Sequence, residues 1–244
     1  MATEAGRPAF YALAPGGWRD YVTLLHPPYT AWHLSYVAIG AALTPAFAWD
    51  RFALTLAAFF LAVGIGAHAL DELSGRPLNT QIPHGVLVGL AVVSIAGAIA
   101  LGVVGALTMT PWLVAFILAG GFIVVAYNLE LFGGVFHNGF WFALAWGSFP
   151  LVTAYFAAAE KLDAVVAAGA VFAFLLSHAQ RLLSTPVRDV RRRVTRVEGR
   201  IDRRDGSSEP ITGELLLRGN EGALRALALA TVALAAALVI MRTT

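Results

Sequence analysis

The sequence predicts an all-α membrane protein, a polytopic helical bundle of about seven transmembrane helices. Of its 244 residues, 58% are hydrophobic and only 13% are charged, whereas about half of the residues in soluble domains are apolar and about a quarter are charged. The apolar residues also fall into runs of about 20, the helical length that crosses a hydrocarbon core of about 30 Å. Water is therefore not the main solvent of this chain.

The predicted spans follow one another along the chain as apolar runs separated by polar or turn-forming residues. They cover residues 31–49, 53–72, 85–108, 111–131, 140–159, 163–183 and 222–241. The segment before the first span has neither an apolar h-region nor a small-residue cleavage site, so we expect no cleaved signal peptide. The predicted organisation is an N-terminal segment (1–30), a six-helix core that carries the site (31–183), a basic loop (184–221) and a last helix with its tail (222–244).

The basic loop is compatible with two organisations. It carries the turn-rich stretch DGSSEP between two charged stretches, each of which is compatible with a short surface helix. A further half-span inside the loop is the alternative.

The distribution of basic residues predicts the orientation. With seven spans, the N-terminus and the loops after the second, fourth and sixth spans share one side. Of the 17 Lys and Arg, only Arg51, Lys161 and Arg242 fall on the other side, and the remaining 14 fall on the first. The positive-inside rule then places the N-terminus and the basic loop in the cytoplasm, with the protein integral to the cell (inner) membrane. We interpret the charge as a topology signal and a contact for membrane lipids, not for nucleic acid.

The tryptophan and cysteine contents give two further expectations, one for the membrane interface and one for the metal ligands. The six tryptophans are expected mostly to form an interfacial belt. They are Trp18, Trp32, Trp49, Trp112, Trp141 and Trp146. The absence of cysteine excludes disulfides, Fe–S clusters and thiolate metal sites, which leaves His, Asp and Glu as metal ligands.

Ionisable residues inside spans are costly, so they mark candidate functional sites. Here they gather at the predicted cytoplasmic ends of the spans, where they could form one pocket. They are His33, His68, Asp71, Glu72, Glu130, His137, His178 and Arg181, together with Gln180. Residues three or four apart share a helix face, so His68 shares a face with Asp71 and Glu72. Gly133 and Gly134 are expected to break the chain between Glu130 and His137 and to fold the imidazole back beside the carboxylate.

Imidazoles and carboxylates on several helices are typical of a metal cage in a helical bundle. We therefore expect a divalent metal ion, with Fe, Zn or Mn favoured. The predicted ligands are His33, His68, Glu72, Glu130, His137 and His178. The alternative for any single His is a hydrogen-bonded structural residue, and we favour that alternative for His26 and His84, which flank prolines at membrane interfaces.

Several stretches of the chain, from about residue 20 to residue 200, resemble the UbiA-type intramembrane prenyltransferase superfamily. The stretch AHALDELSGRPLNTQIP resembles the family signature that ends the second helix, with Arg76, Pro77 and Leu78 at its RPL and Ile82 and Pro83 at the next helix start. HPPYT is similar to the opening of the first helix. AYNLELFGGVFHNGFWFALAWGSFPLVTAY is similar to the passage from the fourth helix to the fifth.

The resemblance implies a membrane fold, usually of nine helices, in which aspartates of two signatures hold Mg²⁺ against an isoprenyl diphosphate. In this chain the first signature reads Ala67, His68, Asp71 and Gly75, with one aspartate of three, and SHAQRLLSTPVRDVRRR stands where the second is expected. Imidazole favours Zn, Fe, Mn or Cu over Mg²⁺.

Three functions follow from these observations. The first is a UbiA-like membrane enzyme with a His and carboxylate metal site that acts on a lipid or isoprenoid-like substrate; a site with one or two Fe would imply an oxidoreductase and Zn a hydrolase or lyase. Here Asp71 orients a metal ligand or acts as base, Glu72 is a catalytic candidate as well as a metal ligand, and Arg76 and Arg181 bind an anionic headgroup. The second is Mg²⁺-dependent prenyl transfer, with Arg188 and its neighbours on the diphosphate. The third is a transporter or lipid-binding protein without enzymatic activity.

Overall fold

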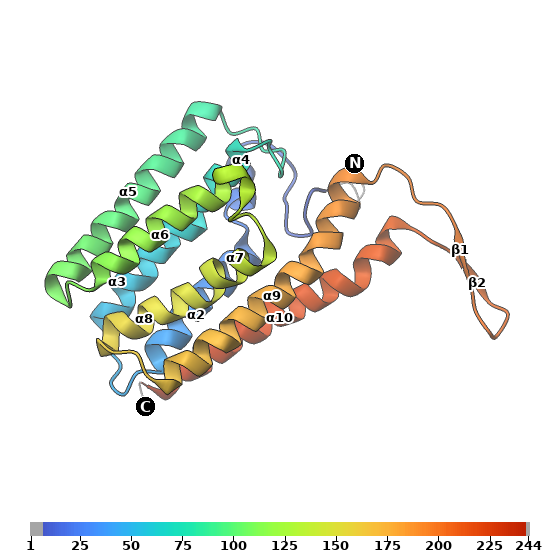
Figure 1. Ribbon diagram of the computed structural model, residues 1–244. Coiled ribbons are helices and arrows are strands. Elements are labelled where there is room, and N and C mark those ends of the chain that lie inside the picture. The colour runs from blue at the N-terminus through green and yellow to red at the C-terminus, as the bar shows by residue number, and fades with distance from the viewer. Residues whose placement is uncertain (1–6, 243–244) are drawn as a thin grey trace.

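The computed structural model describes residues 7–242, and this part of the chain is almost entirely helical (Figure 1). Five helical segments are long and apolar enough to cross a membrane. They are α3 continued by η2 and α4 (Trp49–Leu73), α5 (His84–Thr108), α7 continued by η4 and α8 (Gly139–Ala159), α9 (Ala164–Arg193) and α10 (Gly213–Met241). The predicted all-α architecture is confirmed, and these five segments are consistent with an integral membrane protein.

The other two predicted spans are short helices. Each of α2 (Pro27–Ala42) and α6 (Leu113–Asn128) has 16 residues, which at about 1.5 Å per residue is about 24 Å. That length is less than a hydrocarbon core of about 30 Å. All seven predicted runs therefore contain a helix, but the number of seven complete crossings stays a prediction.

The helices form three groups that lie side by side (Figure 1). The first holds α3, α5 and α6, the second α2 and α8, and the third the long pair α9 and α10, with α10 packed on both α2 and α9. Glycines permit close approach between helices, both within a group and between groups. A Cβ on Gly40 of α2 would collide with the carbonyl oxygen of Leu151 on α8, and one on Gly147 would lie 2.6 Å from the carbonyl oxygen of Ala173 on α9. Small residues at such contacts are typical of helix packing in membranes.

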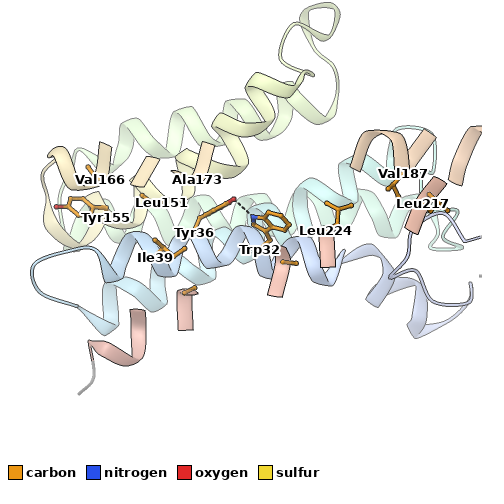
Figure 2. Packing of buried hydrophobic residues seen from close by; sticks show 12 residues of the cluster. Trp32, Tyr36, Ile39, Leu151, Tyr155, Val166, Ala173, Val187, Leu217 and Leu224 are labelled. Atoms are coloured by element: carbon orange, nitrogen blue, oxygen red, sulfur yellow. Dashed lines mark hydrogen bonds between the residues drawn. The ribbon is translucent and has the colours of Figure 1, made fainter. Parts of the chain in front are cut away.

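The main core lies between α2, α8, α9 and α10 (Figure 2). At its centre the indole Nε1 of Trp32 donates a hydrogen bond to the Tyr36 hydroxyl at 2.7 Å, and Ser177 Oγ donates to the same oxygen at 3.0 Å. Trp32 and Trp146 are buried, so the expectation of an interfacial belt is wrong for these two. The outward faces of the helices carry aliphatic side chains, and Val93, Leu107 and Leu229 are each more than two thirds exposed. Such apolar surfaces suit contact with lipid.

The region expected to be a basic loop is partly helical. Helix α9 continues to Arg193 and α10 already begins at Gly213, so both spans extend into residues 184–221. Between them an antiparallel hairpin of β1 (Arg200–Asp202) and β2 (Ser208–Pro210) projects from the bundle (Figure 1). Residues 184–221 thus hold the ends of two long helices and a hairpin between them, with no further half-span.

The two ends of the bundle differ in charge. We call the end formed by the N-terminal segment (7–16), α1 (Trp18–Leu24), α4 (His68–Leu73) and the last turns of α9 the polar end. At the opposite, distal end lie Arg51, which pairs with Glu160, Arg242, which donates to the Ala42 carbonyl, and Lys161. The three basic residues predicted to share one side are thus found together, while the orientation in the membrane stays a prediction.

Candidate functional site

A cavity of about 580 Å³ opens at the polar end of the bundle. Its walls come from the N-terminal segment, α2, α4, α6, η4 and the last turns of α9. We call it the polar cavity. Seven of the residues predicted from the sequence line it: His33, His68, Asp71, Glu130, His137, Arg181 and Arg188. The predicted convergence of separate helix ends on one pocket is therefore seen in the fold.

Two π-helical segments position the imidazoles of the inner wall. His68 directly follows η2 (Phe60–Ala67), and its Nδ1 lies 3.1 Å from the Gly64 carbonyl oxygen. His33 on α2 reaches η4 (Leu144–Ser148), where its Nδ1 lies 2.8 Å from the Trp146 carbonyl oxygen. Because such wide turns disturb the regular helical hydrogen bonds, they often occur at functional sites. In both residues Nδ1 contacts the backbone.

The break after α6 also brings two predicted residues together. Gly133 and Gly134 adopt positive φ angles of 68° and 78°, which glycine accepts without steric cost. The chain turns back there, so that His137 Nδ1 lies 3.8 Å from Glu130 Oε1 and 3.0 Å from the Tyr127 carbonyl oxygen. The predicted fold-back of His137 beside Glu130 is confirmed.

Three predicted site residues do not line the cavity. Glu72 is fully buried, and its carboxylate accepts hydrogen bonds from Leu78 N at 3.0 Å, Thr80 N at 2.9 Å and Thr80 Oγ1 at 2.8 Å. Arg76 donates to the carbonyl oxygens of Thr80 and Ile82. These hydrogen bonds hold the loop after α4 in shape, and the roles of Glu72 as a metal ligand and of Arg76 as a headgroup contact stay predictions.

His178 is the third. Its ring stacks on Phe174 with centroids 6.2 Å apart, and it packs against Gly139, away from the polar cavity. Within residues 7–242 no group of three His, Asp or Glu side chains is arranged to hold a metal ion. The predicted Fe, Zn or Mn ion therefore stays a prediction without geometric support from these residues.

Positive charge without a carboxylate partner distinguishes the cavity. Arg181 and Arg188 are half-buried, and neither forms an ion pair with a residue of the described chain. The Arg181 guanidinium lies 5.5 Å from the centre of the Phe142 ring, a cation–π distance. Asp71 interacts electrostatically with Arg188 and Arg192 but accepts none of the hydrogen bonds found in residues 7–242. This combination leaves charge available for a ligand.

Buried polar atoms without a partner lie in the same walls. Among the described side chains they include His26 Nε2, Tyr127 Oη and Gln180 Oε1, and all three residues line the polar cavity. Since buried polar groups are almost always hydrogen-bonded, three orphaned atoms around one cavity indicate a polar ligand.

His26, which the sequence analysis did not include among the site residues, also lines the polar cavity. Its imidazole stacks on His68, with ring centroids 4.0 Å apart and planes 8° apart, and its Nδ1 lies 2.8 Å from the Tyr11 hydroxyl oxygen. Burial lowers the pKa of His26 well below 6.5, and His68, Arg192 and Arg188 lower it further. The stretch HPPYT is the sequence feature that could have identified His26 as a cavity residue, because its prolines start α2 directly after His26 and fix the imidazole at the N-terminus of the helix. No comparable feature in the sequence marks Tyr11.

A second cavity lies among the helices of the first group and α8. It has a volume of about 120 Å³ and is walled mainly by apolar side chains of α3, η2, α5, α6 and α8, among them Leu54, Ile117 and Phe149. We call it the apolar cavity. Trp146 lines both cavities, so a charged compartment and an apolar compartment are neighbours.

Comparison of the chain with models of protein families, with curated proteins and with solved structures finds no significant match.

Proposed function

We propose that this chain is an integral membrane enzyme that acts on an amphipathic lipid or isoprenoid-like substrate with an anionic head. The head occupies the polar cavity, and the apolar chain of the substrate runs past Trp146 toward the apolar cavity. The observation that carries the proposal is the pair of half-buried arginines without a carboxylate partner, Arg181 and Arg188, in a cavity that also holds three orphaned polar atoms.

The charge of the cavity supports an anionic head. Removing cations from water without an ion-pair partner is costly. In this fold the described residues form no ion pair with Arg181 or Arg188, and Asp71 interacts with Arg188 only electrostatically. A phosphate or diphosphate supplies oxygens that match the forked donors of a guanidinium. By the positive-inside rule the cavity faces the cytoplasm, where such a head would be delivered in soluble or membrane-bound form.

Asp71 is the residue we assign to proton transfer. It lines the cavity, and because it accepts no hydrogen bond from the described chain, its carboxylate is available to take a proton from a substrate hydroxyl or to return one to a leaving group. The resemblance to UbiA-type enzymes favours transfer of an isoprenoid group, and Glu130, which lines the same cavity, is a further candidate oxygen ligand for Mg²⁺.

Binding of matched probes tests the proposal. Protein in lipid nanodiscs is titrated with farnesyl diphosphate, with farnesol, which has the chain without the anion, and with inorganic diphosphate, which has the anion without the chain. We expect farnesyl diphosphate to bind most tightly. Replacing both Arg181 and Arg188 by Gln should weaken it by about 100-fold or more, since each lost charge-assisted hydrogen bond costs about 1.5–3 kcal/mol.

The matched control is Arg218→Gln, an exposed arginine near the start of α10 and outside both cavities. Equal binding of farnesol and farnesyl diphosphate would contradict the proposal. Release of diphosphate from the bound probe in the presence of an acceptor, lost in Asp71→Asn, separates an enzyme from a lipid-binding protein.

The metal prediction has its own test. Elemental analysis of protein purified in mild detergent should find stoichiometric Fe, Zn or Mn if imidazoles hold a transition metal, and that metal should be lost in His68→Ala. Stimulation of probe turnover by Mg²⁺ alone would instead favour the prenyltransferase alternative, because Mg²⁺ prefers oxygen ligands.

A further inference from the structure

The N-terminal segment reaches into the polar cavity through Tyr11. Pro8, Ala9, Phe10 and Tyr11 line the cavity. The Tyr11 hydroxyl is the hydrogen-bond partner of His26 Nδ1, while the opposite ring nitrogen, His26 Nε2, is buried without a partner in the described chain. A connected unit thus runs from the segment through Tyr11 to an unsatisfied imidazole nitrogen.

The segment is fastened so that Tyr11 stays in place. Arg191 Nη1 donates to the Arg7 carbonyl oxygen at 3.1 Å and Arg192 Nε donates to that of Pro8 at 3.3 Å. The Arg225 guanidinium lies 5.0 Å from the centre of the Phe10 ring. Helices α9 and α10 therefore hold the segment across the polar end, and the Tyr11 ring packs edge-on against Tyr29 at 5.5 Å.

The hydrogen-bond partners of the two groups indicate the direction of their hydrogen bond. Within residues 7–242, His26 Nδ1 is the one hydrogen-bond partner of the Tyr11 hydroxyl, so the phenol proton has an acceptor there only if the hydroxyl donates to Nδ1. A neutral imidazole has one donor and one acceptor nitrogen. With Nδ1 as the acceptor, the single ring proton resides on Nε2.

A buried N–H without an acceptor is uncommon in native structures. Stacking on His68 holds the His26 ring in its plane, and the prolines that start α2 fix its backbone. The donor is thus pre-oriented at the wall of a cavity that also presents Arg181 and Arg188. An oxygen of an anionic head is the acceptor that this combination of donors suits.

We infer that His26 Nε2 donates a hydrogen bond to the head of the ligand in the polar cavity, and that Tyr11 is the positioning residue that fixes the required tautomer. This inference rests on the proposed function and adds to it that the N-terminal segment is part of the binding site. His26 contacts the ligand, and Tyr11 acts only through His26.

A double-mutant cycle with farnesyl diphosphate in nanodiscs tests the assignment. His26→Ala should weaken binding by about 2–10-fold, the effect of one neutral hydrogen bond, and Tyr11→Phe should weaken it by no more than that. His26→Gln places an amide N–H near the position of Nε2 and should restore most of the affinity. In the His26→Gln background, Tyr11→Phe should have no further effect, because an amide has no tautomer to fix.

The controls separate this role from simple packing. Tyr21→Phe removes the hydroxyl of an exposed tyrosine on α1, and His84→Gln changes an exposed histidine at the start of α5; both lie outside the cavity and should bind as the wild type does. Thermal midpoints identify any variant that fails to fold. Additive losses in the two backgrounds would overturn the assigned role of Tyr11, and unchanged affinity in folded His26→Ala would overturn that of His26.

Nitrogen NMR of histidine-labelled protein tests the tautomer without any ligand. We expect the His26 proton on Nε2 and an unprotonated, hydrogen-bonded Nδ1 whose resonance shifts in Tyr11→Phe. A proton on Nδ1 would overturn the inference whether or not the probe binds. If the wild type bound the three probes equally, the proposed function would fail, whereas normal binding with wild-type affinity in His26→Ala would remove only the inference.

Discussion

The two ends of the bundle use the same charged residue types in opposite ways. At the distal end, Arg51 pairs with Glu160 at 2.8 Å, Lys161 pairs with Asp163 at 3.2 Å, and Arg242 donates to a backbone carbonyl. In the polar cavity, the described residues supply no ion-pair partner to Arg181 or Arg188 and no hydrogen bond to Asp71. The distal charges are thus paired within the fold, whereas Arg181, Arg188 and Asp71 in the cavity remain available to a ligand.

The difference belongs to the cavity and not to the polar end as a whole. At that same end Arg191 and Glu221 form a bidentate pair that is almost completely buried, with Arg191 Nη2 at 3.0 Å from Glu221 Oε2. Because a protein that buries charge normally pairs it, pairing separates structural charges from those that await a ligand. The contrast therefore predicts which substitutions affect stability and which affect binding.

The largest expected effect is on stability, from Glu221→Ala. The substitution leaves Arg191 with its guanidinium buried and without its carboxylate, and breaking a buried pair from one side costs about 3–5 kcal/mol. The N-terminal segment, which accepts a hydrogen bond from the same guanidinium, should loosen as well. Thermal unfolding in detergent measures the first effect, and proteolysis of the segment measures the second.

The matched substitution at the distal end is Glu160→Ala. This pair is partly exposed, with side-chain exposures of 25% and 44%, and such pairs contribute at most about 1 kcal/mol. Equal destabilisation by the two substitutions would show that the distal and polar pairs are not different in kind.

Much of the fold followed from the sequence because the bilayer imposes simple rules. Length and apolar content located the helices, and the 3.6-residue period placed His68 and Asp71 on one wall of the cavity. The local effect of Gly133 and Gly134 was also predictable, because a pair of glycines next to polar residues typically ends a helix.

The rest depends on contacts between distant segments. No local pattern distinguishes Glu72, which caps backbone groups of the following loop, from its neighbour Asp71, which faces the cavity. From the sequence, Trp32 resembles an interfacial aromatic residue, and only the packing of α10 on α2 shows that it is buried. The role of Tyr11 depends on the way α9 holds the N-terminal segment. Tertiary hydrogen bonds of this kind leave no periodic signal.

Asp71 and Glu72 provide the next test, because two adjacent carboxylates have opposite expected roles. Glu72→Gln replaces one acceptor oxygen by an amide and leaves a buried donor of Leu78 or Thr80 unsatisfied, which costs about 1–3 kcal/mol. Asp71→Asn removes no hydrogen bond within the described chain and should change stability by no more than about 0.5 kcal/mol. Unfolding midpoints of the two variants measure the difference.

The effects of the two substitutions on activity should be the reverse of their effects on stability. Asp71→Asn should abolish turnover of the probe while the protein still folds, and Glu72→Gln should keep the turnover of whatever fraction is folded. A stable Glu72→Gln protein without activity would show that Glu72 takes part in function, and it would contradict the structural role that its hydrogen bonds indicate.

The smallest expected effect is at the distal end, where Asp163 caps α9. A hydrogen bond from the Tyr155 hydroxyl, with smaller contributions from Lys161 and the Val166 N–H, lowers the pKa of Asp163 to about 2. A lowered carboxyl pKa stabilises the fold above the ordinary value of 3.8, and this stabilisation is lost as the pH falls from 3.8 toward 2. Asp163→Asn should therefore lower the thermal midpoint at pH 5 and progressively less toward pH 2. Asp50→Asn, which changes an exposed carboxylate at the start of α3, is the control. A constant difference between wild type and Asp163→Asn across that range would show that the ionised cap contributes nothing, and the distal charges would then no longer contrast with those of the cavity.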